Sequence, residues 1–153
     1  MTSDSIHNLK SKIQNQTLYP VILAVPKKAA DLKAQDRVAF LGRHARKALE
    51  LSAKKSHIVL GELNKDEQGA PLPFDDTYWA ITHKTEYVGG VVSTAPIGID
   101  IEKIQVCSRG LFKKTAGESE WALIDSSRKD FTTFFRYWTS KEAVLKASAT
   151  GIK

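Results

Sequence analysis

Residues 130–149 contain neither glycine nor proline, and their apolar side chains recur at helical spacing, which predicts one long amphipathic helix. Glu142 lies inside the apolar stripe of that helix. An ionised carboxylate is costly to bury alone, so its position predicts a partner such as a metal ion, a cationic side chain or a strong hydrogen-bond donor. The other members of the stripe are Phe131, Phe134, Phe135, Trp138, Leu145 and Ala149.

A second acidic feature lies upstream, in residues 97–102, where isoleucine alternates with other residues. This period of two predicts a half-buried strand with Asp100 and Glu102 projecting together from the face opposite the isoleucines. On an ideal strand the two carboxylates start only roughly 6.6 Å apart, so they repel unless a cation lies between them or water screens them. Oxygen ligands suit Mg²⁺, and with Glu142 three acids would share one ion. The pattern predicts metal-assisted phosphoryl chemistry.

Each acidic feature also has a simpler interpretation. Two acids at alternate strand positions are commonly the solvated face of a strand. Glu142 and Lys146, four residues apart, are in the favourable order for a surface ion pair on a helix, worth only about 0.2–0.5 kcal/mol. The combination of both features with the position of Glu142 in an apolar stripe favours the metal site over these alternatives.

The same two segments resemble a known family motif. Residues 98–102 read Gly-Ile-Asp-Ile-Glu, and about forty residues later residues 138–146 read Trp-Thr-Ser-Lys-Glu-Ala-Val-Leu-Lys. In this order they resemble the two-part motif of the 4′-phosphopantetheinyl transferases. Gly-Ala-Pro at 69–71 and Ala-Ile-Thr-His at 80–83 are similar to segments of the larger, surfactin- and siderophore-synthetase (Sfp-like) type of this family. The resemblance extends over residues 37–151.

The resemblance implies an activity and a set of site residues. Members of this family transfer the 4′-phosphopantetheine group of coenzyme A to a serine of an acyl or peptidyl carrier protein and release adenosine 3′,5′-bisphosphate. We therefore expect a holo-[acyl-carrier-protein] synthase type transferase, with Mg²⁺ bound by Asp100, Glu102 and Glu142. Glu142 would also take the serine proton, while Lys146 and Lys141 would neutralise phosphate charge. The nucleophile belongs to the partner protein.

The resemblance implies a coenzyme-binding surface as well. His83 and Lys146 would contact the phosphates of coenzyme A. Residue 70 is alanine in this chain, whereas many relatives have a phosphate-binding lysine there. Lys84 is expected to supply the missing charge from a neighbouring position.

A predicted helix at residues 31–51 adds two arginines to that surface. Arg37 and Arg43 resemble the arginines with which the family binds the 3′-phosphate, and arginine suits bidentate phosphate contacts. A cationic helix face that serves only solubility is the alternative. The apolar stripe of this helix comprises Ala34, Val38, Leu41, Ala45, Ala48 and Leu49, and its cationic side comprises Lys33, Arg37, Arg43, His44 and Lys47.

The predicted fold is α+β and 4′-phosphopantetheinyl transferase-like, with two similar lobes and the coenzyme between them. We expect an N-terminal lobe in residues 1–94 and a partial C-terminal lobe, which carries the metal and catalytic motif, in residues 95–153. Relatives continue past the motif helix into further strands, so the second lobe is expected to be incomplete. Apolar runs predict strands at 21–25, 56–63, 78–82 and 87–93, and a short helix at 118–124.

Charge and composition agree with this expectation. The chain of 153 residues has a formal net charge of +6 and is 42% apolar, enough to bury a core. A basic chain favours acidic partners, and the carrier proteins of this family are typically acidic. The single Cys107 rules out an internal disulfide, and no apolar run approaches the ~18 residues of a membrane span. A cytoplasmic protein without membrane contact is expected.

Two other functions stay open. A catalytically impaired family member, or a fragment of one, could bind coenzyme A or a carrier protein without turnover. A basic nucleic-acid-binding domain is the second alternative, prompted by the cationic helix and the three tryptophans. It predicts binding that falls steeply with salt and does not depend on Glu142. We expect no nucleic-acid partner, because Trp138 fits the core stripe and the sequence shows no nucleic-acid-binding motif.

Overall fold

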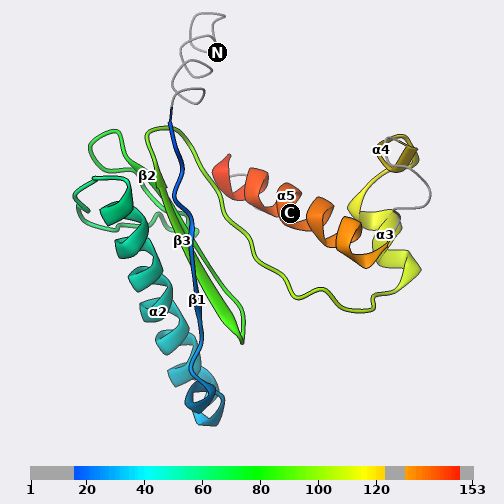
Figure 1. The fold of residues 1–153 in the computed structure, drawn as a ribbon, viewed down its shortest axis with the longest axis horizontal. Coiled ribbons are helices and arrows are strands. Elements are labelled where there is room, and N and C mark those ends of the chain that lie inside the picture. The colour runs from blue at the N-terminus through cyan, green and yellow to red at the C-terminus, as the bar shows by residue number, and fades with distance from the viewer. Residues whose placement is uncertain (1–15, 123–129, 149–153) are drawn as a thin grey trace, which may run out of the picture.

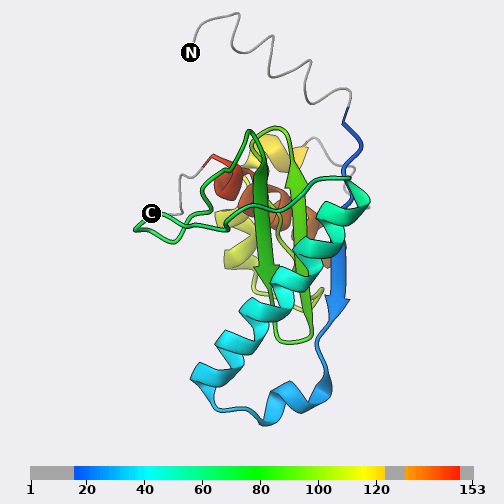
Figure 2. The same ribbon diagram turned by 90° about the vertical axis from the view of Figure 1, so that its left-hand side faces the viewer.

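The computed structural model describes residues 16–122 and 130–148. Its elements in chain order are β1 (Val21–Ala24), a 3-10 helix η1 (Lys27–Asp31), α2 (Ala34–Lys55), β2 (Tyr78–His83), β3 (Tyr87–Ser93), α3 (Arg109–Thr115), α4 (Glu118–Ala122) and α5 (Phe131–Ala147). The strands form one antiparallel sheet with β3 between β1 and β2. Helix α2 covers one side of this sheet, and α5 lies on the other (Figures 1 and 2). The predicted mixture of helices with a small antiparallel sheet is confirmed.

Helix α2 packs on the sheet through small and aliphatic side chains. Gly90 of β3 lies so close to the helix that a β-carbon there would overlap the backbone of Leu49. A residue without a side chain is therefore required at this point of contact. The buried residues around it form two clusters, one of Leu41, Ala45, Ala48 and Val88 and one of Leu49, Ala53, Trp79 and Val92.

The predicted apolar stripe of α2 is correct from Leu41 onward and wrong at its start. Ala34 and Val38 are exposed, because the first turns of the helix project past the β2–β3 hairpin (Figure 1). The predicted cationic side is wrong for His44. Its Nε2 atom is 3.0 Å from the Ala24 carbonyl oxygen of β1, so the ring lies toward the sheet.

The side of the sheet opposite α2 carries the segment that follows β3. Gly89 points to this side, and a β-carbon there would be 3.2 Å from the Cδ1 atom of Ile99. Gly98, one residue earlier in the segment, lies against α5, where a β-carbon would overlap the Ala143 carbonyl group. Residues 96–102 therefore run between the sheet and α5 (Figure 1).

The strands predicted at 21–25, 78–82 and 87–93 are confirmed as β1, β2 and β3. β2 and β3 form an antiparallel hairpin in which Thr82 lies opposite Gly89. Because side chains alternate along a strand, this pairing directs Thr82 to the same side of the sheet as Gly89 and the segment that covers it.

The strands predicted at 56–63 and 97–102 are wrong. Helix α2 continues to Lys55, and Val59, beyond it, is 91% exposed between half-buried neighbours. Residues 97–102 pair with no strand in the part of the chain that the structure describes. Alternating hydrophobicity indicates which side chains are buried, but it does not report whether a neighbouring strand supplies hydrogen bonds.

Helix α5 is the helix predicted at residues 130–149, and it begins at Phe131. Asp130 caps it, because its Oδ1 atom accepts a hydrogen bond from the backbone amide of Thr133 at 2.8 Å. The last predicted stripe residue, Ala149, lies outside the described residues.

The first half of the apolar stripe of α5 packs against α3 and α4. Phe134 is fully buried, and its ring centroid is 4.5 Å from that of Phe112 in α3. Trp121 of α4 lies between Phe112 and Tyr137, with centroids 5.5 and 5.1 Å away. Helix α4 confirms residues 118–122 of the predicted short helix, whose end lies outside the described residues.

The division into lobes at residue 94 and the two-lobe symmetry stay predictions.

Among residues 16–122 and 130–148, no helix is long and apolar enough to cross a membrane.

Candidate active site

The acid-bearing segment reaches α5 because Gly98 has no side chain. A β-carbon at Gly98 would overlap the Ala143 carbonyl group and lie 2.9 Å from the backbone nitrogen of Ala147. This backbone-to-backbone contact brings Asp100, two residues further on, beside the C-terminal half of α5. The glycine of the predicted motif therefore determines how closely the two halves of the motif approach each other.

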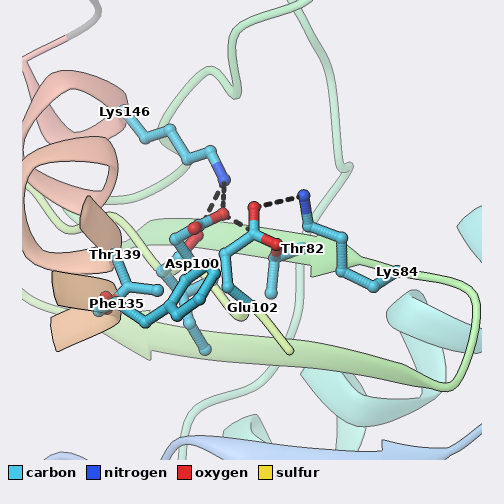
Figure 3. Close-up of polar contacts among 8 residues, drawn as sticks. Thr82, Lys84, Asp100, Glu102, Phe135, Thr139 and Lys146 are labelled. Carbon is cyan, nitrogen blue, oxygen red and sulfur yellow. Dashed lines mark hydrogen bonds and ion pairs between the residues drawn. The ribbon is translucent and has the colours of Figure 1, made fainter. Parts of the chain in front are cut away.

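Asp100 is held between α5 and β2. Its Oδ1 atom accepts hydrogen bonds from Lys146 Nζ at 2.7 Å and from Thr82 Oγ1 at 3.4 Å (Figure 3). Lys146 Nζ also donates to the Ile99 carbonyl oxygen at 3.1 Å. Only 5% of the Asp100 side chain is exposed, and its Oδ2 atom is buried without a hydrogen-bond partner in the described structure. A buried carboxylate oxygen left without a partner is costly, so this atom is suited to a ligand.

Glu102 lies next to Asp100 and has a lysine of its own. Lys84, the first residue after β2, places Nζ 2.5 Å from Glu102 Oε1. Figure 3 shows the two acids side by side, with Lys146 approaching from α5 and Lys84 from the hairpin end of the sheet. Each acid thus has one cation beside it, and the four charges cancel.

Glu142 and Lys146 both line a pocket of about 630 Å³ between α5, β2 and the loop before β2. Glu142 is half-buried, as its place in the apolar stripe predicts. Residues 69–71, the Gly-Ala-Pro turn of the family resemblance, line the same pocket, as do Lys65 and Leu145. Cationic, acidic and apolar walls together suit a ligand that has both phosphate and apolar parts.

His83 lies in a cationic environment at the end of β2. Partial desolvation lowers the pKa of its ring, Lys65 and then Lys146 lower the pKa further, and Lys84 adds a smaller contribution. More than a third of the residue remains exposed. The lowered pKa favours the neutral ring, which can donate one hydrogen bond to a ligand.

Lys141 lies apart from these groups. Its Nζ atom is 2.6 Å from Oε1 of Glu120 in α4. The hydrogen bond from Lys141, followed by that from the Gly117 backbone amide, lowers the pKa of Glu120. Lys141 thus links α5 to α4 through an ion pair. This ion pair with Glu120 must break before Lys141 can contact a phosphate.

The two predicted arginines lie on α2, on the far side of the sheet from α5. Arg37 Nη2 donates to the carbonyl oxygens of Ala30 at 2.7 Å and Leu32 at 3.0 Å, so this guanidinium supports the entry into the helix. Arg43 is exposed on the helix surface. Of the two, Arg43 has the more accessible guanidinium.

Within the described residues, no group of three or more acidic, histidine or cysteine side chains is arranged to hold a metal ion. The Mg²⁺ site of Asp100, Glu102 and Glu142 therefore stays a prediction. The residues nevertheless fit such an ion. Carboxylates supply the hard oxygen donors that Mg²⁺ prefers, and the buried Oδ2 atom of Asp100 has no competing hydrogen bond in the described structure.

Two side chains beside the site are missed by the sequence reasoning. Thr82 is recognised from the sequence only as part of a motif. Its position on β2, opposite Gly89 of β3, could have indicated that its side chain faces Asp100. Lys65 has no such signal, because it lies in an irregular loop whose fold depends on an isolated backbone bridge to Pro71.

The second part of the chain is similar to known proteins. Residues 96–153 match the family model of the 4′-phosphopantetheinyl transferase superfamily. Over 90 residues the chain is 32% identical to the 4′-phosphopantetheinyl transferase gsp of Aneurinibacillus migulanus. The aligned region covers 58% of this chain and 38% of that protein. It is 31% identical over 90 residues to the 4′-phosphopantetheinyl transferase Sfp of Bacillus subtilis (strain 168), covering 56% of this chain and 40% of that protein.

These matches confirm the resemblance that the motifs predict: residues 96–153 are similar to the 4′-phosphopantetheinyl transferase superfamily. In particular, its relatives include Sfp itself, the type that the motifs indicate. The matched regions span less than half the length of these curated relatives. The matched region includes Asp100, Glu102 and Lys146, which lie beside one another (Figure 3), and Glu142, which lines the pocket together with Lys146.

Proposed function

We propose that this chain transfers the 4′-phosphopantetheine group of coenzyme A to a serine of an acyl or peptidyl carrier protein. One observation carries the proposal: the close contact at Gly98 accompanies an ion pair between the nearly buried carboxylate of Asp100 and Lys146, and Lys146 lines a pocket together with Glu142. Oxygen donors suited to a divalent cation thus lie beside a cation suited to phosphate. The names of the relatives support the same reaction class.

The proposed reaction is a phosphoryl-group transfer with a carboxylate base. The serine oxygen of the carrier protein forms a bond to the phosphorus that bears the pantetheine arm. The bond from that phosphorus to the oxygen of adenosine 3′,5′-bisphosphate breaks, and the serine proton passes to Glu142. Lys146 neutralises charge on the leaving phosphate. Mg²⁺ held by Asp100, Glu102 and Glu142 would supply Lewis-acid polarisation of the pyrophosphate.

Coenzyme A is proposed to place its pyrophosphate at the pocket beside α5. His83 and Lys84, at the end of β2, would contact phosphate oxygens together with Lys146. Arg43, exposed on α2, would bind the 3′-phosphate. Arg37 would assist only if its guanidinium turns from the backbone carbonyls that it now contacts.

The partner protein is proposed to be an acidic carrier protein in the cytoplasm. The net charge of +6 favours its approach at low ionic strength. The two-lobe architecture of the family is part of this proposal, with residues 95–153 contributing to the second lobe.

Mass spectrometry of an apo carrier protein tests the proposal. After incubation with coenzyme A, MgCl₂ and this protein, the carrier should gain the mass of one phosphopantetheine group, and adenosine 3′,5′-bisphosphate should appear in equal amount. Glu142→Gln should abolish both signals, since the amide can neither accept the proton nor bind the ion as an anion.

Glu50→Gln is the matched control, because it makes the same change at an exposed position of α2 and should leave turnover unchanged. Binding of coenzyme A without mass gain or bisphosphate release would identify a protein that binds without turnover. Equal turnover in wild type and Glu142→Gln would reject the assigned base.

A further inference from the structure

Lys84 occupies the position at Glu102 where a bound cation would be expected. Its Nζ atom is 2.5 Å from Glu102 Oε1, and the Glu102 side chain is only 20% exposed. Asp100 differs, because its Oδ2 atom is left without a hydrogen-bond partner in the described structure. Of the two adjacent acids, Glu102 is thus the one at which a partly exposed lysine, Lys84, would compete directly with a bound metal ion.

We infer that Lys84 is a resident counter-ion of Glu102 that a divalent cation must displace, so that this lysine lowers the metal affinity of the protein. The inference rests on the proposed metal site and adds a residue that sets its affinity. A lysine ammonium and a divalent ion cannot share the same carboxylate oxygen at close range, because their charges repel. Each ion that binds therefore breaks the Lys84–Glu102 ion pair.

The surroundings allow the Lys84 side chain to leave while its backbone stays. The Lys84 amide donates to the Tyr87 carbonyl oxygen at 2.8 Å, which closes the β2–β3 turn. The side chain itself is 46% exposed and borders an open surface pocket of about 670 Å³. Displacement thus moves one flexible chain into solvent and does not require the sheet to rearrange.

Lys146 is held differently, although it also neutralises an acid of the pair. Its ammonium group contacts both the Asp100 carboxylate and the Ile99 carbonyl oxygen, so it has a second anchor when one contact is lost. The inference therefore concerns Lys84 alone, whose ion pair is with Glu102.

Titration of the full chain with Mn²⁺, counted as free ion by electron paramagnetic resonance, tests the inference in the absence of coenzyme A, whose phosphates would bind both Mn²⁺ and Lys84. Lys84→Met keeps the length of the side chain and removes its charge. We expect it to bind Mn²⁺ about two- to five-fold more tightly than wild type, the factor that corresponds to a partly exposed ion pair. Lys84→Arg keeps the charge and should bind Mn²⁺ as wild type does.

Lys103→Met is the matched control. Lys103 also belongs to an exposed ion pair near the acids, 2.9 Å from Glu86, so the substitution removes the same charge without touching Glu102. Its Mn²⁺ affinity should equal that of wild type. An equal gain in Lys103→Met and Lys84→Met, or no gain in Lys84→Met, would overturn the role of Lys84.

Asp100→Asn separates this inference from the proposed function. If wild type binds Mn²⁺ and Asp100→Asn does not, the metal site stands, and the Lys84 comparison decides the inference alone. If neither wild type nor any lysine variant binds Mn²⁺, the proposed metal site fails, and the inference fails with it.

Discussion

Gly98 and Ala143 touch backbone to backbone, and this contact joins the acid-bearing segment to the helix that carries Glu142. The side of Gly98 that would carry a β-carbon is filled by the Ala143 carbonyl group and the Ala147 amide nitrogen. The position tolerates no larger residue without movement of one of the two backbones.

Gly98→Ala should lower the free energy of unfolding by about 1–3 kcal/mol, the usual cost of forcing an extra group into a filled space. It should also reduce turnover, because the segment with Asp100 must move away from α5. Urea denaturation and the carrier-protein assay measure the two effects.

Gly42→Ala is the opposite case and serves as the control. Gly42 lies within α2, and a β-carbon there meets no atom of the described residues within 4 Å. Because alanine favours a helix over glycine by up to about 1 kcal/mol, this variant should be more stable than wild type. Equal effects of the two substitutions would contradict the close contact at Gly98.

The two arginines of α2 should respond differently to substitution. Arg37→Ala removes the donor to the Ala30 and Leu32 carbonyl oxygens, so it should lower the thermal midpoint. Arg43→Ala should leave the midpoint unchanged and weaken coenzyme A binding, because Arg43 is exposed and free to meet the 3′-phosphate. Thermal unfolding and calorimetric titration with coenzyme A distinguish the two outcomes. Loss of stability in Arg43→Ala with intact binding would contradict this assignment.

His83 should titrate below the ordinary histidine pKa of about 6.5. Since the folded protein holds this proton less well than the unfolded chain, the unfolded chain binds more protons between the lowered pKa and about 6.5. The His83 contribution to stability is therefore lost as pH falls through that window and is fully present above it. NMR titration gives the pKa, and urea denaturation of wild type and His83→Gln across the window gives the linked stability.

Lys65→Met should raise the pKa of His83 part of the way toward its ordinary value. Desolvation remains as the largest cause of the shift, so the return is incomplete. Lys28→Met, in η1, is the control and should leave the His83 titration unchanged. A His83 pKa that does not respond to Lys65 would contradict the electrostatic contact between them.

Phe134→Ala should lower the free energy of unfolding by about 3–5 kcal/mol, because Phe134 is fully buried against Phe112 and Phe135. Val144→Ala on the same helix should cost far less, since Val144 is 66% exposed. Chemical denaturation of both variants measures the difference. Similar losses would show that the aromatic cluster does not anchor α5.

The sequence predicts the helices and the hairpin well, because their patterns depend on local spacing. The apolar stripe of α5 is spaced at helical intervals, and the apolar runs of β2 and β3 are short and follow one another along the chain. The strand at 97–102 is predicted wrongly since pairing depends on distant residues. Its isoleucines are partly buried, yet the segment lies between a sheet and a helix and pairs with no strand in the described structure.

The site is predictable in its residues and not in its contacts. The motif indicates Asp100, Glu102, Glu142 and Lys146, and the structure shows Lys146 in contact with Asp100 and Glu142 on the wall of the same pocket as Lys146. No sequence pattern indicates that lysines pair with the acids, because an ion pair across two elements has no fixed spacing along the chain. The position of Lys141 on Glu120 has the same origin.

Gly89 and Gly90 are consecutive on β3, and they open opposite sides of the sheet. Gly90 receives the backbone of α2, and Gly89 receives Ile99 of the acid-bearing segment. The single strand β3 therefore lies between the arginine-bearing helix and the segment that carries the carboxylates. Two adjacent glycines fix the relative position of these two regions. Enlarging either glycine would therefore shift the arginine-bearing helix against the acid-bearing segment without changing any charged group.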